Sequence, residues 1–210
     1  MSTRPPIWGL LLAAGRGSRF GRTKHDLHIG GVSLWERCRR SLIAGGVENV
    51  VLVGDIAGAV PGGGRRRDSV AAGLAAIPDA EGFVLVHDAA RPLVTPQLVR
   101  RVIDRLLGGD VDGVVPAIPV RDTIKRIGGE MVVETVDRSN LVSVQTPQGF
   151  VLGALRAAHD AFPREATDDA AIVEASGGAI AIVAGDPVNM KLTYPEDLAL
   201  AEALRSQGHD

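Results

Sequence analysis

The sequence has little cysteine, few aromatic residues and almost no net charge. Its 210 residues include one cysteine, Cys38, so no disulfide bond can form within the chain. Aromatic residues make up 3% of the chain and hydrophobic residues 45%, so the core has to be built from Val, Leu, Ile and Ala. That mixture is typical of α/β proteins with buried parallel strands. The net charge of −2 argues against a general role in binding nucleic acids or membrane surfaces.

Long hydrophobic runs are absent as well, because no apolar stretch approaches the roughly 20 residues that a membrane-spanning helix needs. The N-terminal MSTRPPIWGLLLAAG resembles a signal peptide in its single cation and short apolar run. That run, however, contains Gly9 and follows Pro5 and Pro6. A first strand after a short tail fits this pattern better. We therefore expect a cytoplasmic protein with no membrane or nucleic-acid partner.

Apolar runs of strand length alternate with helical patterns along the chain. The runs lie at 7–13, 49–54, 82–88, 112–120, 179–185 and 189–193. Several are apolar at consecutive positions, as expected for strands that are buried on both faces. The segments between them carry helix start signals at 33–36 (a capping box), 95–96 and 193–196. This alternation predicts a three-layer α/β fold with a mostly parallel sheet, formed by residues 1–210 as a single domain.

The segment RDTIKRIGGEMVVETVDR, residues 121–138, breaks this alternation. Gly128 and Gly129 supply a turn between two stretches of β-favouring residues, which predicts a β-hairpin. The hairpin has too few apolar residues on one face to belong to the core. We therefore expect a projecting arm that packs on another surface, such as that of a second subunit.

The stretch LLAAGRGSRFGRTK, residues 11–24, combines glycines with the cations Arg16, Arg19, Arg22 and Lys24. As a dinucleotide-binding fingerprint it has its third glycine one position too late, and no strand ending in an acid follows at the right distance. A P-loop is excluded, because Gly-Lys-Ser/Thr does not occur in the chain. A glycine loop that wraps a nucleoside triphosphate, with cations on its phosphates, fits better. A solvated basic loop remains the structural alternative.

Two further segments favour a nucleotide site. GGGRRRDSV, residues 62–70, is a second turn of glycines and arginines that leads into a helix, and helix N-termini attract anions. VHDAARP, residues 86–92, places Asp88 and Arg91 directly after an apolar strand, where open α/β sheets bind ligands. Asp88 could hold Mg²⁺ or a ribose hydroxyl, and a simple Asp–Arg surface pair is the alternative. His87 has no partner at metal-ligand spacing, so we interpret it as structural.

These motifs together resemble a known family, the 2-C-methyl-D-erythritol 4-phosphate cytidylyltransferases of the non-mevalonate isoprenoid pathway. The resemblance runs from about residue 8 to residue 204 and rests on LLAAGRGSRF, Lys24, GGGRRRDSV, VHDAARP, VRDTIKR, TVDR, QTPQGF, TDDA and NMKLTYPEDL. An AAGxGxR motif alone occurs in many nucleotidyltransferases, whereas the series from VHDAARP onward is much more specific. The resemblance implies a three-layer α/β/α nucleotidyltransferase fold. It also implies transfer of the cytidylyl group of CTP to the polyol phosphate, with release of pyrophosphate.

The resemblance also implies roles for individual residues. CTP and its Mg²⁺ are held by Ala13, Ala14, Gly15, Gly63, Ser69, Asp88, Ala89 and Arg91, with Asp88 as the metal ligand. The polyol phosphate is held by Thr123, Arg138, Thr167 and Lys191. Arg19 and Lys24 stabilise the transition state, and Arg138 and Lys191 complete the catalytic set. In this family the arm crosses to a second subunit, so the resemblance implies a homodimer. Several cations suit the reaction, since it brings two polyanions together.

The chain departs from the family pattern in two segments. Thr23-Lys24 stands where the family usually has Pro-Lys, after a shortened loop, and 54–64 is much shorter than usual. Neither departure removes a charged residue that the reaction needs. Three alternatives stay open: a cytidylyltransferase for another polyol phosphate such as ribitol 5-phosphate, a non-catalytic nucleotide-binding domain, and a dinucleotide-dependent oxidoreductase.

Overall fold

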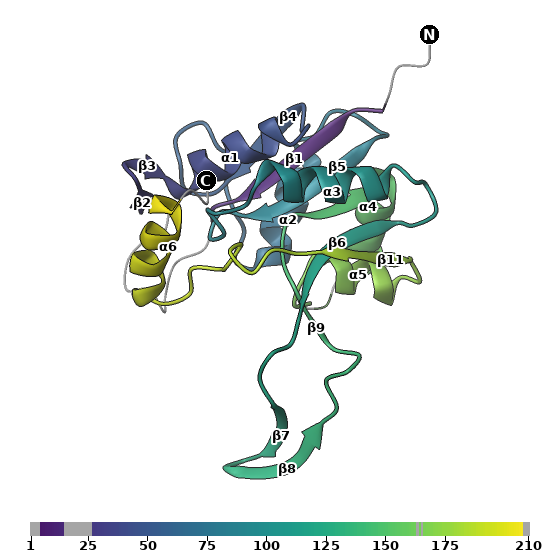
Figure 1. The fold of residues 1–210 in the computed structure, drawn as a ribbon. Coiled ribbons are helices and arrows are strands. Elements are labelled where there is room, and N and C mark those ends of the chain that lie inside the picture. The colour runs from purple at the N-terminus through teal and green to yellow at the C-terminus, as the bar shows by residue number, and fades with distance from the viewer. Residues whose placement is uncertain (1–4, 15–26, 163, 165, 208–210) are drawn as a thin grey trace.

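The computed structural model describes residues 5–14, 27–162, 164 and 166–207, and its central element is a seven-stranded sheet (Figure 1). Its strands are β1 (Ile7–Leu12), β4 (Asn49–Val53), β5 (Phe83–Asp88), β6 (Gly113–Pro119), β9 (Val142–Val144), β10 (Gln148–Val151) and β11 (Ile180–Ala184). The order is β11-β6-β10-β5-β1-β4, with β9 paired to β6. Strand β1 is parallel to β4 and β5, and β11 is parallel to β6. Strand β10 runs antiparallel between β5 and β6.

Helices cover both faces of this sheet, which confirms the predicted three-layer α/β fold. They are α1 (Leu34–Ala44), α2 (Arg66–Ala75), α3 (Pro96–Leu106), α4 (Leu152–Ala161), α5 (Asp169–Ala175) and α6 (Glu196–Ser206). Leu10 and Leu12 of β1 pack with α2, α4 and α5, whereas Ile7 and Leu11 pack with α1 and α3. Successive side chains of a strand point to opposite faces, so both faces need apolar residues. Within the described residues, no helix has the length and apolar character needed to span a membrane.

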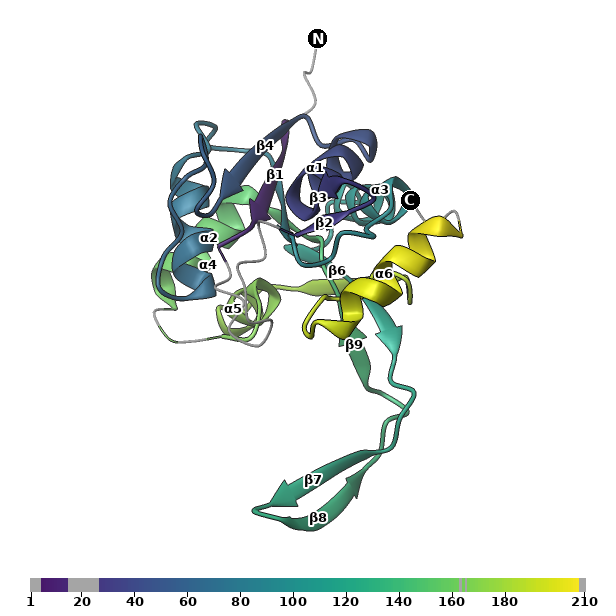
Figure 2. The same ribbon diagram turned by 90° about the vertical axis from the view of Figure 1, so that its left-hand side faces the viewer.

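The last helix belongs to a smaller cluster beside the main sheet. Helix α6 packs on the two-stranded pair β2 (His28–Ile29) and β3 (Val32–Ser33), as Figure 2 shows. The shared core contains Leu27, Ile29, Leu192 and Ala201. The Gly30 amide also donates to the Glu202 carboxylate at 2.9 Å. This cluster anchors Leu27, which follows the basic stretch, and Leu192, which follows Lys191.

Three local predictions differ from the structure. Residues 189–193 form an extended turn region and not a strand, because their polar groups bond to neighbouring loops. Ser33 is the N-cap residue of α1, but its side chain makes no capping hydrogen bond. The N-cap residue of α6 is Pro195, and the Asp197 carboxylate accepts the Thr193 and Tyr194 amides instead. Thr95 caps α3 as predicted, since its hydroxyl accepts the Leu98 amide.

Residues 121–138 contain a β-hairpin that extends away from the main sheet (Figures 1 and 2). Its strands β7 (Ile124–Gly128) and β8 (Met131–Val136) form a separate two-stranded antiparallel sheet. Gly129 has a positive φ of 62° in the turn, a conformation that favours glycine. The side chains of Ile127 and Met131 are 66% and 73% exposed. Among the described residues of this chain, none covers these apolar side chains of the hairpin.

Candidate functional site

Two segments that were predicted to bind CTP lie against each other where β1 ends. The Ala13 amide donates to the last carbonyl of β4 at 2.7 Å, so the chain follows the sheet edge beyond β1. A Cβ atom at Gly62 would lie 2.4 Å from the Cβ of Ala14, so only glycine allows this approach. The Gly63 amide donates to the Ser69 hydroxyl at 3.0 Å. These contacts bring Ala13, Ala14, Gly63 and Ser69 together at the carboxyl edge of the sheet.

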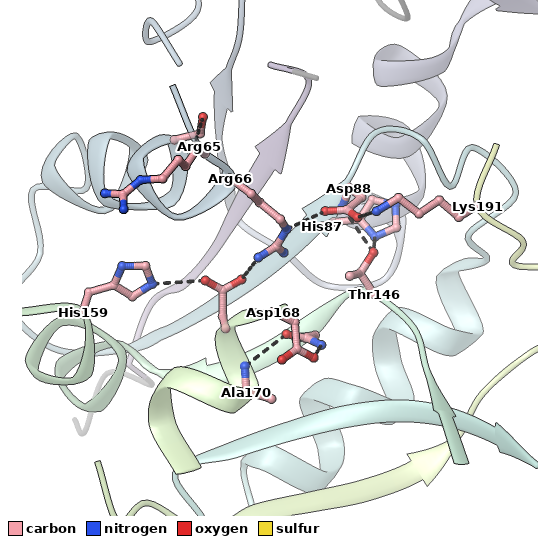
Figure 3. A network of polar contacts seen from close by, with 12 residues as sticks. Arg65, Arg66, His87, Asp88, Thr146, His159, Asp168, Ala170 and Lys191 are labelled. Atoms are coloured by element: carbon pink, nitrogen blue, oxygen red, sulfur yellow. Dashed lines mark hydrogen bonds and ion pairs between the residues drawn. The ribbon is translucent and has the colours of Figure 1, made fainter. Parts of the chain in front are cut away.

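Asp88 is the last residue of β5 and lies at the same edge. Its carboxylate is nearly buried and accepts from two cations: Lys191 Nζ lies 2.6 Å from Oδ2, and Arg66 Nε lies 3.3 Å from Oδ1 (Figure 3). Burial alone would raise the pKa of Asp88, but Arg66 and Lys191 outweigh it and hold this pKa well below its usual range. The carboxylate therefore remains ionised at physiological pH and fixes both cations. The next residue, Ala89, is buried and donates its amide to the end of β1 at 2.9 Å.

The backbone around Asp88 is held by Thr146 and His87. The Asp88 amide donates to Thr146 Oγ1 at 3.2 Å, and the same hydroxyl is 3.0 Å from His87 Nδ1. His87 Nε2 lies 3.2 Å from the Arg91 carbonyl. A neutral imidazole satisfies all three contacts if Thr146 donates to Nδ1 and Nε2–H donates to the carbonyl. This geometry agrees with the interpretation of His87 as a structural residue.

We expect His87 to make the fold sensitive to acid. Burial lowers the pKa of His87 from 6.5 to about 4, although Asp88 opposes this shift. Between these two values the unfolded chain binds a proton that the folded chain does not, so stability falls as the pH falls. The full difference between the two pKa values corresponds to a loss of about 3 kcal/mol in the free energy of unfolding. The free energy of unfolding, measured in urea between pH 7.5 and 4.5, should fall less steeply with falling pH for His87→Gln than for the wild-type protein. An unchanged slope would show that another group governs acid sensitivity.

A second polar network fixes the segment that carries Lys191. The Arg91 guanidinium donates to the Asn189 carbonyl at 2.9 Å, so Arg91 does not form the surface pair with Asp88 that the sequence left open. Asn189 Nδ2 donates to the Thr146 carbonyl at 2.8 Å, and Gln145 Nε2 donates to the Asn189 carbonyl at 3.3 Å. The segment before Lys191 is thus tied to the turn after β5 and to the residues before β10, which directs Lys191 towards Asp88.

Other predicted site residues are not brought to this point within one chain. Thr123 and Arg138 lie near the base of the hairpin, where the Arg138 guanidinium donates to the Arg121 carbonyl. In the described part of the chain, no hydrogen bond or ion pair joins either residue to Asp88 or Lys191. Thr167 directly precedes Asp168, the N-cap residue of α5. Gly15, Arg19 and Lys24 lie outside the described residues.

The structure adds two charged residues, Arg66 and Asp169, to which the sequence analysis assigned no role. Asp169, the first residue of α5, is fully buried and accepts Arg66 Nη1 at 2.7 Å. His159 Nε2 lies 3.1 Å from the other oxygen of Asp169. Arg66 belongs to the GGGRRRDSV motif and Asp169 to TDDA, so both were visible in motifs but without assigned roles. Their pairing joins segments about a hundred residues apart, which local patterns cannot show.

The charges around Asp88 do not fit a metal ion held by protein ligands alone. The described residues contain no group of three or more His, Cys, Asp or Glu side chains placed to hold a metal. Both oxygens of Asp88 already accept from cations. A Mg²⁺ ion needs several oxygen ligands, and this site offers a single carboxylate that is already neutralised.

A sheet whose carboxyl edge gathers a glycine turn, a buried carboxylate and several cations is typical of α/β proteins that bind nucleotides. A family model described as IspD, 2-C-methyl-D-erythritol 4-phosphate cytidylyltransferase, matches residues 7–207. The chain belongs to this family.

Curated relatives and solved structures agree with this family. A protein named 2-C-methyl-D-erythritol 4-phosphate cytidylyltransferase from Rubrobacter xylanophilus is 42% identical over 215 residues, which cover 93% of each chain. A bifunctional enzyme IspD/IspF from Nitratidesulfovibrio vulgaris is 43% identical over 231 residues, and the match covers 95% of this chain but 58% of the relative. The crystal structure of the cytidylyltransferase of the same name from Thermus thermophilus superposes with a TM-score of 0.80 at 36% identity, covering 94% of this chain and 98% of that one.

Proposed function

We propose that this protein transfers the cytidylyl group of CTP to 2-C-methyl-D-erythritol 4-phosphate. A phosphate oxygen of the acceptor attacks the α-phosphorus of CTP, and the bond from that phosphorus to pyrophosphate breaks. The products are 4-diphosphocytidyl-2-C-methyl-D-erythritol and pyrophosphate. The observation that carries the proposal is the meeting of Ala13-Ala14 with Gly62-Gly63 beside the Asp88–Lys191 pair. Relatives of matching length bear the name of this activity.

The proposed CTP site uses mainly backbone groups. The space beside Gly62 is filled by Ala14 and that beside Gly63 by Asp68, so these glycines let the two segments pack closely. The backbone groups of the two segments are proposed to contact the base and ribose. The proposed CTP-binding residues are Ala13, Ala14, Gly15, Gly63, Ser69, Asp88, Ala89 and Arg91. The N-terminus of α2 lies directly after this turn and favours bound anions.

The proposed chemistry depends on positioning and charge neutralisation, and it requires no covalent intermediate on the protein. Arg19 and Lys24 are proposed to stabilise the charge that develops at the α-phosphorus. Lys191 is half exposed and already lies at the sheet edge, so its ammonium group can donate to the acceptor phosphate there. Thr167 is proposed to contribute a hydroxyl from the segment just before α5.

The hairpin supports a proposal of a homodimer. A two-stranded hairpin is marginally stable when isolated in water, and this one exposes Ile127, Met131, Val132 and Val133. Docking on a second copy of the chain would cover these side chains. The same arrangement is proposed to carry Thr123 and Arg138 to the partner subunit's Lys191, where they complete the acceptor site. A neutral polyol with one phosphate would then be bound between two chains.

The requirement for Mg²⁺ remains a prediction. A magnesium ion bound to CTP would neutralise the triphosphate, and its ligands would have to come chiefly from the nucleotide, because Asp88 is occupied by Arg66 and Lys191. Activity lost in EDTA and restored by added Mg²⁺ would support this prediction. Full activity in EDTA would contradict it.

A pyrophosphate-release assay tests the proposed function. We expect turnover of 2-C-methyl-D-erythritol 4-phosphate with CTP and at least about 100-fold lower kcat/KM with ATP, GTP or UTP, because a site lined by backbone groups discriminates by size and hydrogen bonding. Ribitol 5-phosphate is the matched acceptor control. Faster turnover of ribitol 5-phosphate would identify a different acceptor, and equal turnover of a purine triphosphate would contradict a cytidylyl-specific site.

A further inference from the structure

A chain of alternating charges runs from the interior of the protein to the proposed site (Figure 3). His159 contacts Asp169, Asp169 accepts from Arg66, Arg66 donates to Asp88, and Asp88 accepts from Lys191. Within this series of contacts, two carboxylates balance two side-chain cations. The cations can therefore stay in place before a polyanion binds.

Arg66 is held from two sides, by Asp88 and by Asp169. Its Nε atom lies 3.3 Å from Asp88 and its Nη1 atom lies 2.7 Å from Asp169. Burial alone would lower the pKa of Arg66, but Asp169 and Asp88 raise it above its ordinary value, so Arg66 stays charged. Two carboxylates from different elements thus fix the plane of the guanidinium.

The third nitrogen of this guanidinium lacks a partner among the described residues. Arg66 Nη2 is buried and makes no hydrogen bond there. An unpaired buried donor is costly, and such groups are rare unless a ligand or water supplies the acceptor. The two neighbouring carboxylates orient Nη2 without using it. This pattern indicates a donor that is kept for a bound group.

The position of Arg66 indicates which group that is. Arg66 is the first residue of α2, directly after the glycine turn proposed to bind CTP. Its other neighbour, Asp169, follows Thr167 in the segment proposed to bind the acceptor phosphate. Arg66 thus links the turn proposed to bind CTP to the segment proposed to bind the acceptor phosphate, and it lies at a helix N-terminus. A guanidinium in such a place suits a phosphate oxygen, because its planar N–H groups match phosphate geometry.

We propose that Arg66 is a further phosphate-binding residue, which donates Nη2 to an oxygen of the CTP triphosphate, and that Asp169 is the positioning residue that orients it. This inference rests on the proposed function, because it names CTP as the ligand. It adds a contact to that site and changes no step of the reaction.

Direct binding to the full chain tests Arg66. By titration calorimetry, Arg66→Lys should bind CTP about 10- to 100-fold more weakly than wild type, because lysine keeps the charge but loses the oriented fork. Arg65→Lys is the matched control, since Arg65 pairs with Asp68 on the exposed side of the same helix turn, and its effect should stay within about twofold. Cytidine should bind equally to Arg66→Lys and wild type, because it lacks phosphates.

Three results would overturn the assignment of Arg66 to the triphosphate. They are unchanged CTP binding by Arg66→Lys, an equal loss for cytidine, and a raised KM for the acceptor alone. If Arg66→Lys weakens CTP binding as expected but the wild-type protein releases no pyrophosphate, the proposed reaction is refuted and this inference still stands.

A double-mutant cycle tests the positioning role of Asp169. Asp169→Asn should weaken CTP binding about 10-fold, and the double variant with Arg66→Lys should bind no more weakly than Arg66→Lys alone, since both changes remove one interaction. Asp169→Glu keeps the charge and should recover part of the affinity. Thermal unfolding of each variant separates affinity from loss of the fold. Additive losses in correctly folded variants would show that Asp169 does not act through Arg66.

Discussion

Lys24→Ala is expected to lower kcat by about 10²- to 10³-fold while the binding of CTP changes much less. Lys24 closes the basic stretch that follows β1 in the sequence, and we propose that it acts mainly on the charge that develops when the acceptor attacks the α-phosphorus. An interaction made chiefly in the transition state raises kcat rather than substrate affinity. Single-turnover kinetics with CTP and 2-C-methyl-D-erythritol 4-phosphate, together with calorimetric CTP binding, measure the two effects separately.

The basic stretch provides its own control. Arg22→Ala removes a cation two positions away and should lower kcat far less than Lys24→Ala. The reverse result would mean that the shortened loop has passed the role of Lys24 to Arg22. A loss of CTP affinity as large as the loss of kcat would instead show that Lys24 binds the ground state and the transition state equally.

Mixing two inactive variants, Arg138→Ala and Lys191→Ala, is expected to restore activity. If the hairpin carries Arg138 to the partner subunit's Lys191, each single variant has two damaged sites. A mixed dimer then contains one site with both cations and one site with neither, so it should recover about half the activity of a wild-type dimer. The measurement is pyrophosphate release before and after subunit exchange.

The physical basis of this prediction is the separation of the two cations within one chain. Lys191 lies on the Asp88 carboxylate, whereas Arg138 donates to the Arg121 carbonyl at the base of the hairpin. Two cations brought together from different chains repel each other until a phosphate dianion lies between them. Acceptor binding should therefore also tighten the dimer, by linkage.

A matched mixture guards against a trivial recovery. Arg138→Ala mixed with Thr123→Ala should show no such gain, because both residues lie on the same hairpin and would reach the same site. Exchange has to be verified with subunits carrying different tags. An absence of recovery after verified exchange would place Arg138 and Lys191 in the site of one chain, and the shared-site proposal would fail.

The sequence by itself determined most of the sheet. The apolar runs at 7–13, 49–54, 82–88, 112–120 and 179–185 became β1, β4, β5, β6 and β11. This worked because strands covered on both faces must be apolar at successive positions, which is a local property. The hairpin turn was also predictable locally, because Gly128 and Gly129 favour a turn. The structure shows Gly129 with a positive φ there.

Other elements depended on distant partners. Strand β10 contains Gln148 and Gly149 and lacks the apolar pattern of its neighbours, yet it pairs with both β5 and β6. The Gln148 side chain is buried, and its amide donates to Asp168 at 2.7 Å, which offsets the cost of burying this polar group. Residues 189–193 show the opposite error, since an apolar pattern suggested a strand where loop hydrogen bonds hold the chain. Local propensity was overridden by tertiary contacts in both cases.

The candidate site shows the same division. Asp88 was predicted from its place at the end of an apolar strand, because the carboxyl ends of strands converge at one edge of an open sheet. The partners of Asp88 were decided only by the tertiary structure, which chose Arg66 and Lys191 and left Arg91 bonded to the Asn189 carbonyl. Ion pairs form between charges that the fold brings within a few ångströms, and chain packing decides which charges those are.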